Sequence, residues 1–378
     1  MAAAAVSACS KSEPTPQVEG QKEKLNILTS VGGTRAVVTG TTMPQGSAIG
    51  VHVTQGSGPA TAYKGENYVA GGDNLEFGDN VRFDNTADAS KWVSETAASA
   101  AANLMIGAEE GTVYAYYPYT ATVTGVGTAA TIPAAILASG DITTSTTGGA
   151  KHYDATEVDY LYYEPASARN TVSSATTATT PLTMEHAMAS VSFRMYVSAD
   201  APVVSNGDNK YYLMGYTIKN KTSKTLFVAD NTGVTMNIAD GTITTTQTGG
   251  TITRTLNGST GYALTRVAAA NADAPEKDAM IWFSNLTFPI TAIAHSTVNG
   301  LEISDDIEIV FSIKKGLNGT AENYTVDLVV DTTAGSDKWE AGKNYQYTVK
   351  LNAFSKLGIE QVTVTEWVDV VGGDITID

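Results

Sequence analysis

The sequence predicts an all-β protein built from β-sandwiches, and three of its features support this fold class. Short segments rich in β-branched and aromatic residues recur along the 378 residues, several with apolar and polar residues in alternation. Asn-Gly and Asp-Gly pairs, which favour tight hairpin turns, separate many of these segments. One segment alone has the composition of a helix. Many short strands with little helix are typical of packed β-sheets.

The expected strands of the first half begin at residue 25. They are 25–31, 36–39, 48–53, 112–119, 158–163 and 190–197. The last of them alternates strictly, so its apolar residues should share one buried face. These residues are Val191, Phe193, Met195 and Val197. Between these strands, the Ala-rich residues 90–105 predict one short helical insertion.

The second half of the chain continues the same pattern. Its expected strands are 211–219, 226–229, 280–283, 307–314, 324–330, 345–351 and 361–371, with turns at Asp240-Gly241, Asn257-Gly258 and Asn299-Gly300. The alternating side chains of 345–349, together with Trp339, are expected in the core rather than in a binding site.

The length of the chain predicts two or three folded domains, at about 150 residues per domain, and two are favoured because all-β domains run long. The polar, proline-containing residues 11–24 have no apolar period and are expected to form a tether, so 1–24 precede the folded part. We expect an N-terminal domain over 25–197 and a C-terminal domain over 198–378, because the strand that ends at Val197 is followed by Asp200-Ala201-Pro202.

Composition and charge exclude several functional classes. Acidic residues exceed basic residues by 39 − 23 = 16, and a chain of net charge −16 repels phosphate backbones, so we expect no nucleic-acid partner. The single cysteine excludes an intrachain disulfide and a cysteine-based zinc site. The four histidines have no metal-ligand spacing, and no catalytic motif is present. We therefore expect no metal, no cofactor and no enzymatic activity.

The N-terminus predicts lipid attachment. Val6-Ser7-Ala8-Cys9 has the form of a lipobox, in which small residues precede a cysteine that becomes lipidated, so Cys9 is the expected lipidation site. The alternative is an alanine-rich start with an incidental thiol. No run of 18 apolar residues follows, so attachment to a membrane would be through Cys9.

Six segments, taken in order, resemble the Bacteroidales fimbrillin family, the subunits of type V pili. They are the lipobox at Cys9, then 33–37 (GTRAV), 115–119 (AYYPY), 182–193 (LTMEHAMASVSF), 339–349 (WEAGKNYQYTV) and 362–367 (VTVTEW). The resemblance implies two tandem transthyretin-like β-sandwich domains. It also implies a lipoprotein precursor of the outer membrane that becomes part of a cell-surface fimbrium.

The resemblance further implies proteolytic processing. In this family a trypsin-like protease cuts after an arginine just past the first strand, and the matching bond here joins Arg35 to Ala36. Gly32 and Gly33 loosen the backbone, which helps the loop to enter an extended protease site. The alternative for Arg35 is an ordinary exposed charge between two strands.

Cleavage would release the first strand and create a site for a neighbouring subunit. The displaced strand would carry Leu25, Ile27, Leu28 and Val31, and a sandwich that loses an edge strand exposes an unpaired ladder. The donor strand of the family is C-terminal, so the candidate here is 361–378. The apolar residues that would carry the exchange are Val362, Val364, Val368, Val370, Ile375 and Ile377. The alternative for this segment is a final strand of the chain's own domain.

The expected function is therefore that of a pilus subunit in cell adhesion. Its expected partners are other copies and related subunits, a signal peptidase for lipoproteins and a trypsin-like protease. A lipid-anchored tip or anchor subunit is one alternative. A surface glycan-binding lipoprotein is another, in which sugars would stack on tyrosines, and a glycan-active enzyme is a third. Those tyrosines are Tyr116, Tyr117, Tyr119, Tyr162 and Tyr163. The triplet Asp331-Thr332-Thr333 also resembles a bacterial O-glycosylation site.

Overall fold

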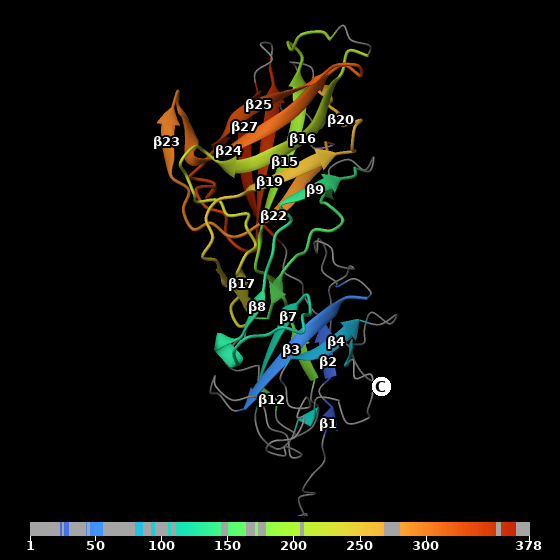
Figure 1. The fold of residues 1–378 in the computed structure, drawn as a ribbon, viewed down its shortest axis with the longest axis vertical. Helices are drawn as coiled ribbons and strands as arrows, with labels where there is room; N and C mark the ends of the chain where they lie inside the picture. The colour runs from blue at the N-terminus through green and yellow to red at the C-terminus, as the bar shows by residue number, and fades with distance from the viewer. Residues whose placement is uncertain are drawn as a thin grey trace, which may run out of the picture.

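The computed structural model describes most of the chain, and nearly all of its regular structure is β. The described residues are 23–24, 26–29, 43, 46–55, 80–85, 92–94, 105–106, 111–144, 150–163, 171–172, 179–204, 208–267, 280–352 and 357–367. They form an elongated molecule with two lobes (Figure 1). Within these ranges the only helical element is one 3-10 turn, η1 (Gly127–Ala129), so the expected all-β fold class is confirmed. No helix among them is long and apolar enough to cross a membrane.

One seven-stranded sheet forms most of the first lobe, which is the lower one in Figure 1. Its strands, in spatial order, are β14 (Glu185–His186), β11 (Leu161–Tyr162), β7 (Gly111–Tyr117), β3 (Ala48–Gln55), β4 (Val81–Asn85) and β5 (Trp92–Ser94), and β12 (Thr171–Val172) also pairs with β7. Alternating residues of β4 are buried, as the period of a strand requires. A compact cluster of buried side chains, including Val51, Phe83 and Tyr117, forms the core of this lobe.

Two sheets, of six and seven strands, form most of the second lobe. The first contains β10 (Lys151–His152), β22 (Trp282–Thr287), β15 (Ala189–Ser198), β26 (Lys343–Leu351) and β27 (Leu357–Glu366) in spatial order, with β21 (Arg266–Val267) beside β15. The second contains β23 (His295–Val298), β24 (Leu301–Lys315), β16 (Tyr211–Asn220), β19 (Thr251–Leu256) and β9 (Ser139–Ile142), with β20 (Tyr262–Ala263) beside β16 and β25 (Ala321–Val329) beside β24.

Three small sheets complete the described structure. Two are strand pairs, β1 (Glu23–Lys24) with β6 (Met105–Ile106) and β2 (Asn26–Thr29) with β13 (Thr179–Leu182). The third contains β18 (Ile243–Thr244), β17 (Thr235–Asn237) and β8 (Thr131–Pro133). The third sheet combines strands that lie a hundred residues apart in the sequence.

Aromatic side chains join the two large sheets across the core of the second lobe. The ring of Phe193, in the first sheet, lies 5.7 Å from that of Phe311 and 5.2 Å from that of Tyr216, both in the second. Edge-to-face contacts at these distances stabilise aromatic pairs beyond the area that they bury. The expected buried face of β15 is confirmed, because its four apolar residues are at most 2% exposed. Trp339 and Tyr345, Tyr347 and Val349 are also buried, as expected.

The expected helix over 90–105 is wrong where the structure describes it. Residues 92–94 form β5, which pairs with β4, and Met105–Ile106 form β6. The remaining residues of that segment lie outside the described part. Trp92 and Val93 have high β propensity, and pairing with an open sheet edge outweighs the helical preference of nearby alanines. The hairpin turn expected at Asn299-Gly300 joins β23 to β24, with φ values of 52° and 83° that suit a tight turn.

The expected domain boundary after Val197 falls inside β15. This strand pairs with β22 and β26, and three earlier strands, β8, β9 and β10, pair with strands from the second half of the chain. β9 and β10 therefore belong to the two large sheets of the second lobe, and β8 to the small sheet with β17, although all three precede β11 and β14 of the first lobe. The division into two domains stays a prediction, and any boundary must allow for this crossing of the chain between the lobes.

Candidate assembly site

β2 forms part of the first strand expected from the sequence, 25–31. β2 pairs in parallel with β13, with Ile27 opposite Thr180 and Leu28 opposite Pro181. Among the described residues β13 is its only strand partner. Of the residues expected on a displaced strand, Ile27 and Leu28 therefore lie on a strand with one neighbour. Leu25 and Val31 lie outside the described residues.

The partner of β2 leads directly into the core of the first lobe. Leu182, the last residue of β13, is 1% exposed, and Met184 is fully buried. Both belong to the same buried cluster as Val51 and Tyr117. A change in the pairing of β13 would thus affect the packing of this core, because Leu182 is the last residue of the strand and Met184 follows two residues later.

Cys9, Arg35 and Ala36 lie outside the described residues. Lipid attachment at Cys9 and cleavage between Arg35 and Ala36 remain predictions.

The C-terminal candidate strand is partly engaged within the chain. β27 pairs with β26 over its whole length, with Val362 opposite Tyr347 and Val364 opposite Tyr345. Val362 is 7% exposed and packs in the core of the second lobe. We therefore no longer assign Val362 and Val364 to a donor strand, since they complete the chain's own sheet. Val368, Val370, Ile375 and Ile377 lie outside the described residues.

A buried cluster anchors the end of β27 against the first lobe. The Trp367 ring stacks on the ring of His186, with centroids 3.8 Å apart and planes 12° apart. Nδ1 of His186 lies 2.9 Å from Oδ2 of Asp159, and both side chains are fully buried. The backbone N–H of Trp367 donates to the carbonyl oxygen of Gly342 at 2.7 Å. The chain therefore leaves the described structure from a fixed point beside β14, the outer strand of the first lobe's sheet.

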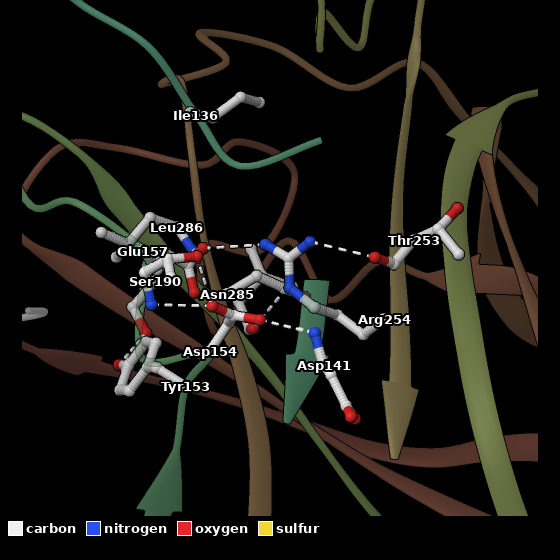
Figure 2. Close-up of polar contacts among 12 residues, drawn as sticks. Ile136, Asp141, Tyr153, Asp154, Glu157, Ser190, Thr253, Arg254, Asn285 and Leu286 are labelled. Carbon is white, nitrogen blue, oxygen red and sulfur yellow. Dashed lines mark hydrogen bonds and ion pairs between the residues drawn. The ribbon is translucent and has the colours of Figure 1, made fainter. Parts of the chain in front are cut away.

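A second buried polar cluster links the two large sheets (Figure 2). Arg254 extends from β19 toward Glu157, with Nη2 3.0 Å from Oε1, and both side chains are fully buried. The same carboxylate oxygen accepts the backbone N–H of Leu286, in β22, at 2.6 Å. Burial raises the pKa of Glu157 to about 7, although the Arg254 guanidinium and the Leu286 N–H favour its ionised form. Glu157 thus fastens the connection between β10 and β11 to both sheets.

The tyrosines considered for glycan stacking do not form an exposed platform. Tyr116, Tyr117 and Tyr163 are at most 8% exposed. The hydroxyl of Tyr116 donates to the backbone carbonyl of Thr120, and burial raises its pKa. The half-buried Tyr119 has the Arg82 guanidinium 5.4 Å from its ring centroid. Buried rings cannot stack on a sugar, so these residues do not support a glycan-binding site.

His52, His186 and the triplet Asp331-Thr332-Thr333 take part in hydrogen bonds within the fold. His52 accepts the backbone N–H of Gly127 through Nε2 at 3.2 Å, and His186 contacts Asp159 as described. No group of three His, Cys, Asp or Glu side chains that could bind a metal occurs in the described ranges. Asp331 accepts the N–H groups of Thr333 and Ala334, so it caps the turn in which the exposed Thr332 and Thr333 lie.

Sequence reasoning missed the buried Arg254–Glu157 pair. In β19 the residues Ile252, Arg254 and Leu256 alternate with threonines, and all three are buried. The period of two was therefore a usable signal that Arg254 faces the core. No comparable pattern marks Glu157, which lies in a segment without regular structure.

Several solved structures are similar to this chain. A candidate cell adhesion protein from Bacteroides ovatus has a structure 13% identical in sequence, with a TM-score of 0.50, covering 92% of this chain and 99% of its own. One from Bacteroides uniformis is 16% identical, with a TM-score of 0.49 and the same coverage. A fimbrial protein from Bacteroides vulgatus is 11% identical, with a TM-score of 0.47, covering 92% of this chain and all of its own.

None of the curated proteins compared with the chain matches it. The likeness to the Bacteroides ovatus structure is one of fold. A family model described as fimbrillin-like matches residues 34–367. Because that match spans most of the sequence, the chain belongs to the fimbrillin-like family.

Proposed function

We propose that this protein is a structural subunit of a surface pilus and that its copies join by strand exchange. It would be exported as a lipoprotein modified at Cys9, cleaved between Arg35 and Ala36, and incorporated into a fimbrium that mediates adhesion. Membership of the fimbrillin-like family supports the general role. The observation that carries the mechanism is the position of β2, whose only strand partner among the described residues is β13.

Removal of β2 would leave β13 with an unpaired row of backbone groups. A strand edge of this kind is a template for pairing with another chain. An incoming extended segment would restore the ladder hydrogen bonds, each worth about 0.5–1.5 kcal/mol net, and cover the apolar residues at the end of β13. The parallel pairing of β2 with β13 indicates the register that a replacement would have to satisfy.

The donor segment would be the part of the chain after Trp367. Four of its aliphatic residues, Val368, Val370, Ile375 and Ile377, are the candidates for insertion into a neighbour. Burial of four such side chains contributes roughly 6–12 kcal/mol, at about 1.5–3 kcal/mol each. The loss of translational and rotational freedom on association offsets part of that sum. The remainder is compatible with a joint that persists under mild denaturation.

Controlled cleavage tests the proposal. Purified precursor is treated with trypsin, and the product is examined by N-terminal sequencing and by electrophoresis in detergent without heating. We expect a product that begins at Ala36 and a ladder of oligomers. Arg35→Lys is the matched control because trypsin still cuts it, whereas Arg35→Ala should stay monomeric. A chain truncated after Trp367 should be cleaved but should not polymerise.

Two results would contradict the proposal. Cleavage at many sites without oligomers would favour a binding protein of another kind. Oligomers formed by Arg35→Ala as fast as by the unmodified chain would remove cleavage from the mechanism.

A further inference from the structure

A mainly apolar cleft opens beside the point where the chain leaves β27. It has a volume of about 410 Å³, within the range of roughly 300–1,000 Å³ that is typical of small binding sites. Leu226, Val228 and Ile243 line it, and each is only half-buried. The segment from Phe288 to Thr291 also lines it. Half-buried aliphatic side chains around a hollow favour an apolar occupant, because its burial removes further apolar area from water.

The cleft is adjacent to the anchored end of β27. Ala341 lines it, and the carbonyl oxygen of the next residue, Gly342, accepts the N–H of Trp367 at 2.7 Å. Ile290 also lines the cleft, and it exchanges two backbone hydrogen bonds with Trp339, at 2.7 and 2.8 Å. The wall of the cleft and the departure point of the chain therefore belong to one hydrogen-bonded unit.

The residues that follow Trp367 include apolar side chains that could fill this cleft. They are Val368, Asp369 and Val370, so that in an extended segment the two valines face one way and the aspartate the other. Asp240 is the only acidic or basic residue that lines the cleft. A segment whose valines enter the cleft would point Asp369 away from this carboxylate.

We propose that, in the free subunit, the cleft holds Val368 and Val370 of the same chain. A segment tethered one to three residues from its site has an effective concentration in the millimolar range or above, so it outcompetes the same segment of another copy. Occupancy of the cleft does not depend on the proposed function, but its effect on assembly does. If the segment after Trp367 is the donor, its first residues must leave this cleft before they can enter a neighbour.

Disulfide trapping tests the occupancy. The only cysteine of the sequence is first removed by Cys9→Ser. Thr291→Cys, at a residue that lines the cleft, is then combined with Val370→Cys. The matched control combines Thr291→Cys with Asp369→Cys, which has a shorter tether but should face away. Mild oxidation of dilute protein is followed by nonreducing electrophoresis and intact mass. We expect an intramolecular disulfide that forms about tenfold faster with Val370→Cys than with Asp369→Cys.

Each other result contradicts the proposal. A disulfide-linked dimer as the main product would assign the cleft to a second copy. No disulfide in either pair, or equal rates in the two, would show that the segment does not occupy the cleft in this orientation. None of these readouts needs a fibre, so a failure of strand exchange would leave the trapping result intact. Oxidised, trypsin-cleaved protein that polymerises as fast as reduced protein would show that release from the cleft does not limit assembly.

Discussion

Replacement of Glu157 by alanine should destabilise the protein strongly, because it leaves Arg254 buried without its carboxylate partner. Both side chains are fully buried, and Nη2 of Arg254 lies 3.0 Å from Oε1 of Glu157. The backbone N–H of Leu286 would also lose its acceptor. Removal of one member of a buried ion pair typically costs about 3–5 kcal/mol, since the remaining charge stays out of water. We expect the free energy of unfolding to fall by that amount.

A set of four variants separates the pair from its parts. Glu157→Gln retains an acceptor oxygen for both donors and should cost only about 1 kcal/mol. The double replacement Glu157→Ala with Arg254→Met removes both charges and should cost less than the sum of the two single replacements, because no unpaired charge remains. Arg254→Met alone completes the cycle.

Urea unfolding provides the assay. Tryptophan fluorescence reports on the second lobe through Trp282 and Trp339, which are at most 9% exposed, and Trp92 in β5 adds a signal from the first lobe. A change in midpoint at constant slope measures stability without a change in the surface exposed on unfolding. A loss below about 1 kcal/mol for Glu157→Ala would refute the reasoning. So would a double variant whose cost equals the sum of the single charge removals, because coupled neighbours should not be additive.

Three further predictions concern the core and its pH dependence. Phe193→Ala should cost about 3–5 kcal/mol in chemical unfolding, because the cavity would remove ring contacts with the facing sheet; a cost under 1 kcal/mol would contradict this packing. Gly50→Ala should be destabilising because a Cβ there would lie 2.2 Å from the Tyr116 ring, whereas Gly358→Ala meets nothing within 4 Å and should be nearly neutral in thermal melts. Burial raises the pKa of Glu157 from 4.5 to about 7, so the folded chain binds this proton more tightly than the unfolded chain, and the free energy of unfolding should fall as the pH rises from 4.5 through about 7. Glu157→Gln cannot titrate, so the stability of the unmodified chain relative to this variant should decrease over that range, and a constant difference would exclude this linkage.

Local patterns were enough to predict the fold class and much of the core. Alternation in 190–197 correctly placed Phe193 in the interior, because a strand has a period of two whatever its neighbours are. The Asn299-Gly300 turn was likewise predictable, since positive φ values at both positions favour these residues. The helix over 90–105 failed for the opposite reason, because an available sheet edge outweighs a weak local propensity.

Which strands meet could not be derived from the sequence. Alternation shows that a segment has a buried face, but not which face of which sheet covers it. Thus 131–152 appeared to belong with the strands around it, whereas β8, β9 and β10 pair with strands more than a hundred residues away. The pairing of β2 with β13 and that of β27 with β26 are facts of the same kind.

The sequence by itself determined that the chain forms many short strands, which of their faces are apolar, and where tight turns lie, because these properties depend on residues a few positions apart. Tertiary structure alone decided that β2 pairs with β13, that Trp367 packs on His186 at the end of the last strand, and that Glu157 contacts Arg254. Those outcomes arise from contacts between residues distant in the sequence, whose free energy depends on the packing of the whole molecule.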